Sequence, residues 1–315
     1  MKNTKRKIKG HLDLFSGIGG FSLGLERAGI EPEWIGYSDI DKNCNQVFKR
    51  RFNAEELGSI TDIRTEDLPE IDLVTFGFPC QDLSVANIKR KGLKGGERSS
   101  LFFEATRIIR DKKPKYFICE NVRGLFSSNK GEDFIIVLQE FADIGYDVQW
   151  ELLNTKCEGG LPQNRERVYI VGHLRGESRP QVFPLGKSDF KNNGIQRQYT
   201  NTLTARYGAQ GGPGTGSYII EGQHYEEKVK IADWRSDEGL RIRKNNISPT
   251  LTLATPPYII NGDIRKITPV EAARLQGFPD DWNDCQSDSQ RYKQYGNSIS
   301  VPIAESIFNK LYKEK

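Results

Sequence analysis

The chain has 315 residues, of which 36% are hydrophobic and 28% charged, and its formal net charge is +4. This length suggests about two domains with a sizeable core, and the composition excludes a disordered chain or a minimal disulfide scaffold. Apolar runs such as 134–138 are far shorter than the roughly 20 residues that span a bilayer. We therefore expect no membrane partner and a cytoplasmic location.

The cysteines lie at positions 44, 80, 119, 157 and 285 and form no C-x-x-C pair. This spacing predicts neither a zinc site nor a disulfide framework. Each cysteine is then either a small buried hydrophobe or a reactive thiol.

Residues 10–174 alternate short apolar runs with segments of helical period, which is typical of βαβ units. The predicted strands are 11–15, 34–39, 71–76, 116–120, 146–154 and 168–173. The predicted helices are 21–28, 42–52, 100–110 and 132–144. The pattern predicts an α/β fold with a doubly wound, mostly parallel sheet.

From residue 175 to about 262 the helical period disappears, and glycine, proline and short Thr-rich runs predict a second, smaller, loop-rich β domain. The repeated Thr-Leu-Thr at 202–204 and 250–252 predicts two similar strand starts in one small sheet. Thr268 and Pro269 are typical of a helix start, and a last helix is expected over 301–312. The predicted domains are 1–174, 175–265 and 266–315.

Between the first predicted strand and helix lies a glycine turn, Asp13-Leu14-Phe15-Ser16-Gly17-Ile18-Gly19-Gly20-Phe21. Such a turn lies at the carboxyl end of its strand, where doubly wound sheets bind ligands. Asp39 ends the second predicted strand, and Asp62 is expected to end a third one in the same manner. A turn and two acids at successive strand ends predict an adenosine site, although a plain tight turn would also explain the glycines.

The next predicted strand runs into Gly77-Phe78-Pro79-Cys80-Gln81, which places Cys80 at the same edge. The ring of Pro79 fixes the backbone angle φ of Pro79 just before Cys80. This restriction helps to hold a reacting atom in place. Cys119 is expected in the core, whereas Glu120 is expected to turn outward at the end of the following strand. A thiol and a carboxylate on neighbouring strand ends form a specific constellation, with a structural role for Cys80 as the alternative.

These residues resemble the DNA (cytosine-5) methyltransferase family of the prokaryotic or phage type over nearly the whole chain. Six segments match the motifs of the family in order: 15–20, 77–81, 120–122, 163–167 (Gln163-Asn164-Arg165-Glu166-Arg167), 274–279 and 295–298. The resemblance implies a Rossmann-like fold that uses S-adenosyl-L-methionine, with a target recognition domain at 175–265.

The family's reaction is the transfer of a methyl group to C5 of a cytosine that is flipped out of the duplex. The resemblance implies that Cys80 is the nucleophile that adds to C6, and that Glu120 holds the base at N3 and the exocyclic amine. Arg165 and Arg167 would orient the base and the catalytic loop, with Arg167 the better candidate for cytosine O2.

The resemblance assigns the ribose hydroxyls to Asp39 and the adenine to Asp62 and Ile63. The full set of expected cofactor-binding residues is Phe15, Gly17, Ile18, Gly19, Asp39, Ile40, Asp62, Ile63, Pro79, Leu101 and Asn297. No metal is expected.

Residues 88–98 are strongly basic, with Lys89, Arg90, Lys91, Lys94 and Arg98 against the single Glu97. They are either a solvated loop or a strip that meets phosphates. The longer stretch 82–98, which contains them, resembles the family's mobile catalytic loop. Further expected nucleic-acid contacts in the later region are Arg206, Arg241, Arg243 and Thr250.

The expected partner is double-stranded DNA. The chain is expected to be a monomer at the nucleoid of a prokaryotic cell, and either the modification partner of a separately acting restriction endonuclease or a solitary or phage enzyme. A tRNA-methylating branch of the family and a catalytically silent DNA-binding relative are the alternatives. The tRNA branch usually carries a Cys-Phe-Thr element, which does not occur here. A silent relative would lack the Pro-Cys or Glu-Asn-Val residues, which are present.

Overall fold

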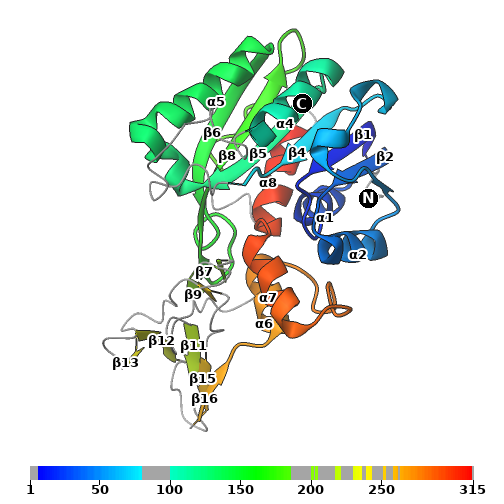
Figure 1. Ribbon diagram of the computed structural model, residues 1–315. Coiled ribbons are helices and arrows are strands. Elements are labelled where there is room, and N and C mark those ends of the chain that lie inside the picture. Colours follow the sequence, from blue (N-terminus) through cyan, green and yellow to red (C-terminus); the bar gives the residue numbers. More distant parts are fainter. Residues whose placement is uncertain are drawn as a thin grey trace. The chain divides into compact units, whose positions relative to one another are not determined.

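The computed structural model describes residues 6–79, 100–185 and 263–313, together with short strands between 200 and 261 (Figure 1). Side chains are described for 6–79, 101–185 and 267–313. The chain forms two compact units: unit 1 contains 1–153, 167–185 and 304–315, and unit 2 contains 154–166 and 186–303. The functional boundaries 1–174, 175–265 and 266–315 stay predictions.

Unit 1 is built on a seven-stranded sheet of order β3-β2-β1-β4-β5-β8-β6. Its strands are β1 (Arg6–Leu14), β2 (Ile30–Ser38), β3 (Glu55–Glu56), β4 (Leu73–Phe76), β5 (Tyr116–Val122), β6 (Tyr146–Asn154) and β8 (Glu166–Leu174). The pairs from β3 to β5 are parallel, whereas β8 runs antiparallel to β5. The predicted α/β class with a mostly parallel sheet is confirmed.

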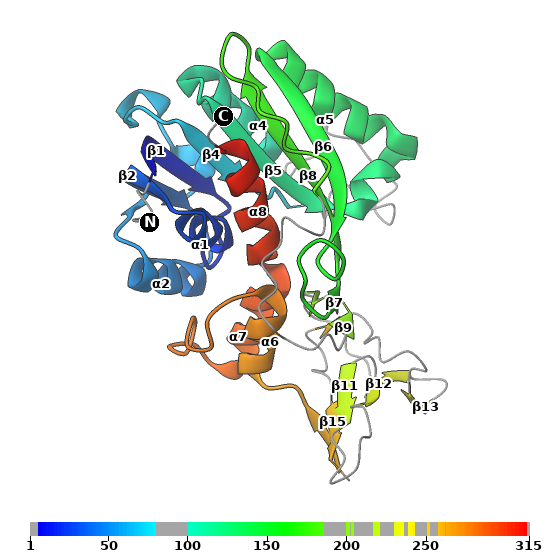
Figure 2. The same ribbon diagram turned by 180° about the vertical axis from the view of Figure 1, so that it is seen from behind.

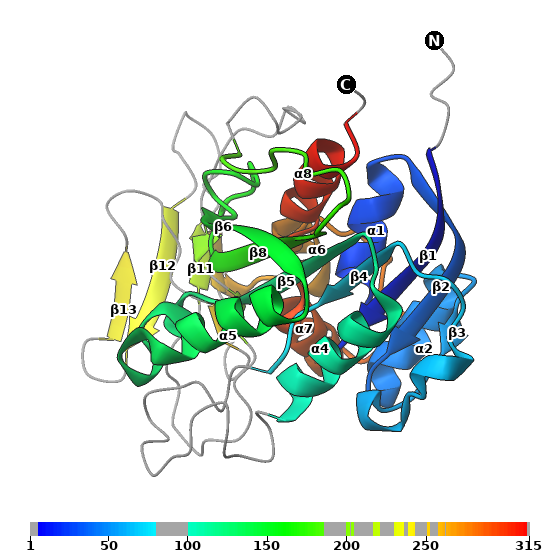
Figure 3. The same ribbon diagram turned by 90° about the horizontal axis from the view of Figure 1, so that it is seen from above.

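Helices cover both faces of this sheet. They are α1 (Gly20–Arg27), α2 (Lys42–Arg51), α4 (Ser100–Lys112), α5 (Glu132–Asp143) and α8 (Val301–Leu311). Helices α4 and α5 lie side by side on one face (Figures 1 and 3). Helix α1 and the later part of α8 lie on the other face (Figures 2 and 3), so closely that a Cβ on Gly24 would lie 2.7 Å from Cβ of Ala304.

The helices form where apolar residues recur at helical spacing. In α4, Phe102, Ala105, Ile108 and Ile109 are fully buried against the sheet. The 3-10 turns that the structure describes in this unit are η1 (Ile60–Asp62), η2 (Thr65–Asp67), η4 (Arg123–Phe126) and η5 (Ser128–Gly131). No helix in the described ranges is long and apolar enough to cross a membrane.

Unit 2 contains a five-stranded sheet of order β13-β12-β11-β15-β16 and two small pairs, β10-β14 and β7-β9. The strands are β7 (Gln163–Asn164), β9 (Thr200–Asn201), β10 (Leu203–Thr204), β11 (Ser217–Ile220), β12 (Lys230–Arg235), β13 (Gly239–Ile242), β14 (Leu251–Thr252), β15 (Tyr258–Asn261) and β16 (Asp263–Lys266). The repeated Thr-Leu-Thr is explained, because Leu203 and Leu251 are partners in the pair β10-β14.

Unit 2 also contains α6 (Pro269–Gln276) and α7 (Asp288–Asn297). The predicted start of α6 is confirmed: Thr268 and Glu271 form a reciprocal capping box, and Gly277 ends the helix at φ 82°. Helix α7 was not expected from the sequence, because its apolar positions are few. It is held by residues such as Gln294 and Tyr295, which are buried.

Candidate active site

The glycine turn between β1 and α1 is a strained, hydrogen-bonded loop at the carboxyl edge of the sheet. Phe15, Gly17 and Gly19 all have positive φ, at 52°, 53° and 80°. Gly19 N donates to Ser16 O at 2.9 Å. A Cβ on Gly19 would lie 2.6 Å from the ring of Phe52, so this position requires glycine.

Asp39, directly after β2, holds this turn from the neighbouring strand. Its Oδ2 accepts from Gly17 N and its Oδ1 from Asp41 N, each at 2.8 Å. Burial raises the pKa of the Asp39 carboxyl, and these backbone hydrogen bonds oppose the rise. Asp39 therefore shapes the loop, a role that the sequence reasoning did not foresee beside its predicted one toward ribose.

The surroundings of this turn fit an adenosine-type ligand. A Cβ added to Gly17 would meet no atom of the described residues within 4 Å, so the described part of the chain leaves space there. Ile40, next to Asp39, is 83% exposed, so its apolar side chain is accessible to a ligand at this edge. Ile18 is buried beneath the loop and supports it from inside, while Phe15 packs partly against the core.

The prediction that Asp62 ends a third strand is wrong. Asp62 is the exposed last residue of η1, and β3 contains only Glu55–Glu56. The turn forms because Ser59 caps it, with its Oγ accepting from Thr61 N at 3.4 Å. Ile63, which follows Asp62, is buried in the core.

The other half of the site is an ion pair between Glu120 on β5 and Arg167 on β8. Arg167 Nε lies 3.0 Å from Glu120 Oε1, and the two side chains are 13% and 12% exposed. The antiparallel pairing sets Arg167 opposite Val122, two residues from Glu120. The start of β8 thereby reaches the edge at which β5 ends, and paired residues share one face of a sheet.

The strand end that leads to Cys80 is built around Glu120. A Cβ on Gly77 would lie 3.2 Å from Glu120 Oε2, so glycine leaves room for the carboxylate. Asn121 is buried and its Nδ2 donates to Phe78 O at 3.3 Å, which ties β5 to the backbone just before Pro79. Sequence reasoning did not single out Asn121 except as part of the Glu-Asn-Val motif.

Arg165 is also fully buried, but inside unit 2. Its Nη1 donates to Gly296 O at 3.0 Å and its Nη2 to Ser298 O at 2.7 Å. It thus joins two of the predicted motifs, with Asn297 exposed between the two carbonyls. Its expected role toward the base stays a prediction.

Cys119 is a core residue, as predicted. It is 1% exposed, and burial raises the pKa of its thiol well above the usual value. A thiol in that state is a poor nucleophile, because the thiolate is the reactive form.

A buried polar chain lies beneath the glycine turn and was not predicted. Thr75 Oγ1 donates to Asp13 Oδ1 at 2.8 Å, Ser22 Oγ donates to Asp13 Oδ2 at 2.9 Å, and His11 Nε2 lies 2.7 Å from Thr75 Oγ1. Burial raises the pKa of Asp13 to about 7 and lowers the pKa of His11 to about 3. The only sequence signal for this chain is polar residues inside otherwise apolar strands.

Several predicted site residues cannot be placed. Cys80, the basic residues Lys89, Arg90, Lys91, Lys94 and Arg98, and Arg206, Arg243 and Thr250 lie outside the described residues. Arg241 lies in β13, where only the backbone is described. Pro79 is exposed at the last described position before Cys80, and Leu101, in the first turn of α4, packs partly against the core. Within the described ranges, no cluster of His, Cys, Asp or Glu could hold a metal ion.

Comparison with known proteins identifies the family. The model of the C-5 cytosine-specific DNA methylase family matches residues 10–210 and 196–313. The chain is 34% identical to the Type II methyltransferase M.NlaX of Neisseria lactamica, over 94% of each chain. It is 30% identical to the Type II methyltransferase M.HhaI of Haemophilus parahaemolyticus, over 94% of this chain and 92% of the relative.

Solved structures share the fold at lower identity. The methyltransferase EhMeth of Entamoeba histolytica matches with a TM-score of 0.63 and 18% identity, over 98% of both chains. The Dnmt2 methyltransferase of S. pombe matches with a TM-score of 0.61 and 18% identity, over 95% of this chain and 96% of that one. The matched length and the relatives at 30% and 34% identity establish that the chain belongs to the C-5 cytosine-specific DNA methylase family and is a DNA (cytosine-5) methyltransferase.

Proposed function

We propose that the chain transfers a methyl group from S-adenosyl-L-methionine to C5 of a flipped-out cytosine in double-stranded DNA, through a covalent bond between Cys80 and C6. The observation that carries this proposal is the Glu120–Arg167 pair at the sheet edge, beside the strand end that leads into Cys80. The pair is mostly shielded from water, and it offers an acid and a cation to one side of a planar base.

The chemistry needs a nucleophile because C5 of cytosine reacts poorly with electrophiles. Addition of the Cys80 thiolate to C6 forms an S–C6 bond and moves the electron pair of the C5–C6 double bond toward C5. Glu120 at N3 and the exocyclic amine would hold the ring in place while negative charge develops on it, and Arg167 suits cytosine O2. C5 would then bond to the methyl group with this electron pair, and the bond between that methyl group and sulfur would break to release S-adenosylhomocysteine.

The final step restores the aromatic base. C5 loses its proton to a base or to water, the C5–C6 double bond reforms, and the S–C6 bond breaks to release the Cys80 thiolate. Flipping the base costs a few kcal/mol in lost stacking and pairing, which contacts of the basic residues 88–98 with phosphates would offset.

The proposed cofactor site is the glycine turn with Asp39, Ile40 and Asp62. S-adenosyl-L-methionine supplies an electrophilic methyl group when it is bound. Asp39 would hold the ribose hydroxyls and Asp62 the 6-amino group of adenine. The open space at Gly17 and the exposed Ile40 support this assignment.

The biological role that we propose is modification of one DNA sequence by a monomer in the cytoplasm of a prokaryotic cell, paired with a separately acting endonuclease. Support comes from relatives that are named Type II methyltransferases. Residues 175–265 would read the target sequence.

Bisulfite sequencing tests both activity and sequence context. We expect protected cytosines at one recurring sequence in DNA from a host that expresses the chain, and none with Cys80→Ser. Cys119→Ser is the matched control, because the Cys119 thiol is buried and should not take part.

DNA with 5-fluorocytosine in the target sequence should form a covalent complex with the wild type only, since fluorine cannot leave as a proton. Methylated tRNA with unmodified DNA would overturn the choice of substrate, and full activity of Cys80→Ser would overturn the mechanism.

A further inference from the structure

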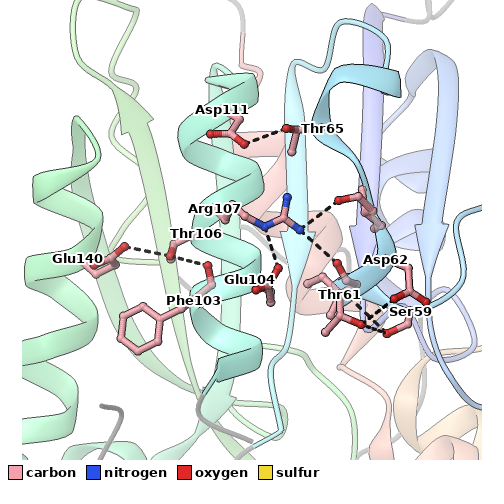
Figure 4. Close-up of polar contacts among 12 residues, drawn as sticks. Ser59, Thr61, Asp62, Thr65, Phe103, Glu104, Thr106, Arg107, Asp111 and Glu140 are labelled. Carbon is pink, nitrogen blue, oxygen red and sulfur yellow. Dashed lines mark hydrogen bonds and ion pairs between the residues drawn. The ribbon is translucent and has the colours of Figure 1, made fainter. Parts of the chain in front are cut away.

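Helix α4 reaches across to the segment that carries Asp62 (Figure 4). Arg107 Nη2 donates to Ile63 O at 3.1 Å and to Ile60 O at 3.4 Å. One turn later, Asp111 Oδ2 accepts from Thr65 Oγ1 at 2.8 Å. The helix is therefore hydrogen-bonded both to the η1 turn and to the start of η2.

The two carbonyls that Arg107 binds lie on either side of Asp62 in the chain. The side chains of Ile60 and Ile63 are buried in the core, whereas Asp62 is exposed. Thr61 Oγ1 also donates to Asp62 Oδ1 at 3.2 Å (Figure 4). A single 3-10 turn has poor internal hydrogen-bond geometry, so its position depends on such outside contacts.

Arg107 is itself held in one orientation. Its Nε donates to Glu104 Oε2 at 2.8 Å, three residues earlier on the same helix (Figure 4). Because the guanidinium is planar, this contact at Nε fixes the direction of the nitrogen that binds the carbonyls. Both side chains are about 30% exposed, so solvent weakens the ion pair without removing its directional effect.

Helix α4 does not need Arg107 to stay in place. Its buried stripe packs in the core, and Glu140 on α5 accepts from Thr106 Oγ1 at 3.0 Å and from Arg110 Nη2 at 2.9 Å. Loss of the Arg107 side chain should therefore free the turn and leave the helix in position.

We propose that Arg107 is a positioning residue of the cofactor site, which holds the Ile60–Ile63 turn so that Asp62 meets the 6-amino group of adenine. The inference rests on the proposed function, because it takes Asp62 as the group that contacts adenine. The inference assigns a role to Arg107, which does not touch the cofactor. By positioning Asp62, Arg107 determines the selectivity for adenine over bases that lack the 6-amino group.

The test compares two ligands that differ at this group: S-adenosylhomocysteine and S-inosylhomocysteine, in which a carbonyl replaces the 6-amino group. We expect the wild type to prefer the adenine compound in calorimetric titrations. Arg107→Ala should bind the adenine compound about tenfold more weakly, as expected for a lost charge-assisted hydrogen bond, and the inosine compound almost unchanged. Arg107→Lys should lie between them, because an ammonium cannot reproduce the planar fork.

Arg110→Ala is the matched control, since it removes an arginine from the same helix that pairs with Glu140 instead. Its preference for adenine should equal that of the wild type. Melting curves show whether each variant folds, and Arg107→Lys serves if Arg107→Ala does not. Equal weakening of both ligands, or unchanged preference in a folded Arg107 variant, overturns the inference. Failure of the wild type to bind either ligand contradicts the proposed function instead.

Discussion

The two halves of the candidate active site are built in different ways. Around the glycine turn, backbone amides bind neighbouring oxygens: Asp39 Oδ2 accepts from Gly17 N in the turn, and Asp39 Oδ1 accepts from Asp41 N at the start of α2. At the other half, Glu120 and Arg167 approach to 3.0 Å, yet Glu120 Oε1 has no aligned hydrogen bond among the described residues. In our proposal, the cofactor half is thus held through main-chain amides, whereas the base half would use the Glu120 oxygen for a substrate.

The largest effect should come from the base half. Glu120→Gln removes the acid, and we expect kcat to fall about 10²- to 10³-fold because the charge on the ring is no longer stabilised. Affinity for S-adenosylhomocysteine should not change. Transfer of tritiated methyl groups to DNA measures the first quantity and calorimetry the second.

Glu140→Gln is the matched control for Glu120→Gln. Glu140 on α5 forms an ion pair of similar length, in which its Oε1 lies 2.9 Å from Arg110 Nη2 on α4, and the substitution weakens that pair. It should leave kcat near the wild-type value. A Glu120→Gln enzyme with normal kcat would remove the contrast between the two halves.

A smaller effect is expected when the room for Glu120 is reduced. Gly77→Ala places a methyl group about 3.2 Å from Glu120 Oε2, so the carboxylate must shift. We expect kcat to fall about tenfold, since a misplaced group loses much of its effect, while binding of the cofactor product stays normal. Gly124→Ala is the control, because its Cβ would make only an ordinary contact at 3.6 Å with Val122. Equal kcat values for the two variants would show that the position of Glu120 is not constrained.

In the cofactor half, a substitution should change the affinity for S-adenosylhomocysteine more than it changes kcat. Asp39→Asn leaves one carbonyl oxygen for two backbone amides, so one amide loses its acceptor. We expect about tenfold weaker binding of S-adenosylhomocysteine and a kcat at saturating cofactor within a few-fold of wild type. Asp41→Asn should bind normally, because asparagine caps the start of α2 as well as aspartate does. A drop in kcat without a drop in affinity would reverse the assignment of Asp39.

The smallest effect on activity is expected beneath the turn, where Asp13 changes the pH dependence of stability. Its folded pKa of about 7 lies above its ordinary value, so between about pH 4 and 7 the native state holds a proton that the unfolded state has lost. This contribution to the unfolding free energy therefore decreases as pH rises. His11, with a pKa lowered to about 3, contributes in the opposite direction between about pH 3 and 6.5.

Asp13→Asn should remove the falling contribution and leave the rising contribution of His11 in place. The unfolding free energy from urea titrations should then increase with pH between about 4 and 6.5, more steeply than in the wild type, by up to about 1.4 kcal/mol per pH unit. A variant with the same pH dependence as the wild type would mean that Asp13 is not the titrating group.

The local patterns of the chain predicted much of the fold. The strand and helix order of residues 10–174 follows from apolar periodicity, and the capping box at Thr268 follows from residue types alone. The turn at Asp62 was mistaken for a strand end, since a capped 3-10 turn and a short strand look alike in a stretch of four residues. Helix α7 was missed because tertiary burial, and not amphipathic periodicity, stabilises it.

Sequence alone determined which chemical groups the protein has and the order in which they occur: a glycine turn, two acids, a Pro-Cys, a Glu-Asn-Val and two arginines. Motifs of this kind are local, because backbone strain and strand ends depend on neighbouring residues. Tertiary structure alone decided which groups meet. The antiparallel course of β8 brings Arg167 to Glu120, and the packing of α4 brings Arg107 to the carbonyls beside Asp62. These contacts join residues more than 40 positions apart, and only the folding of the sheet and its helices brings such distant positions together.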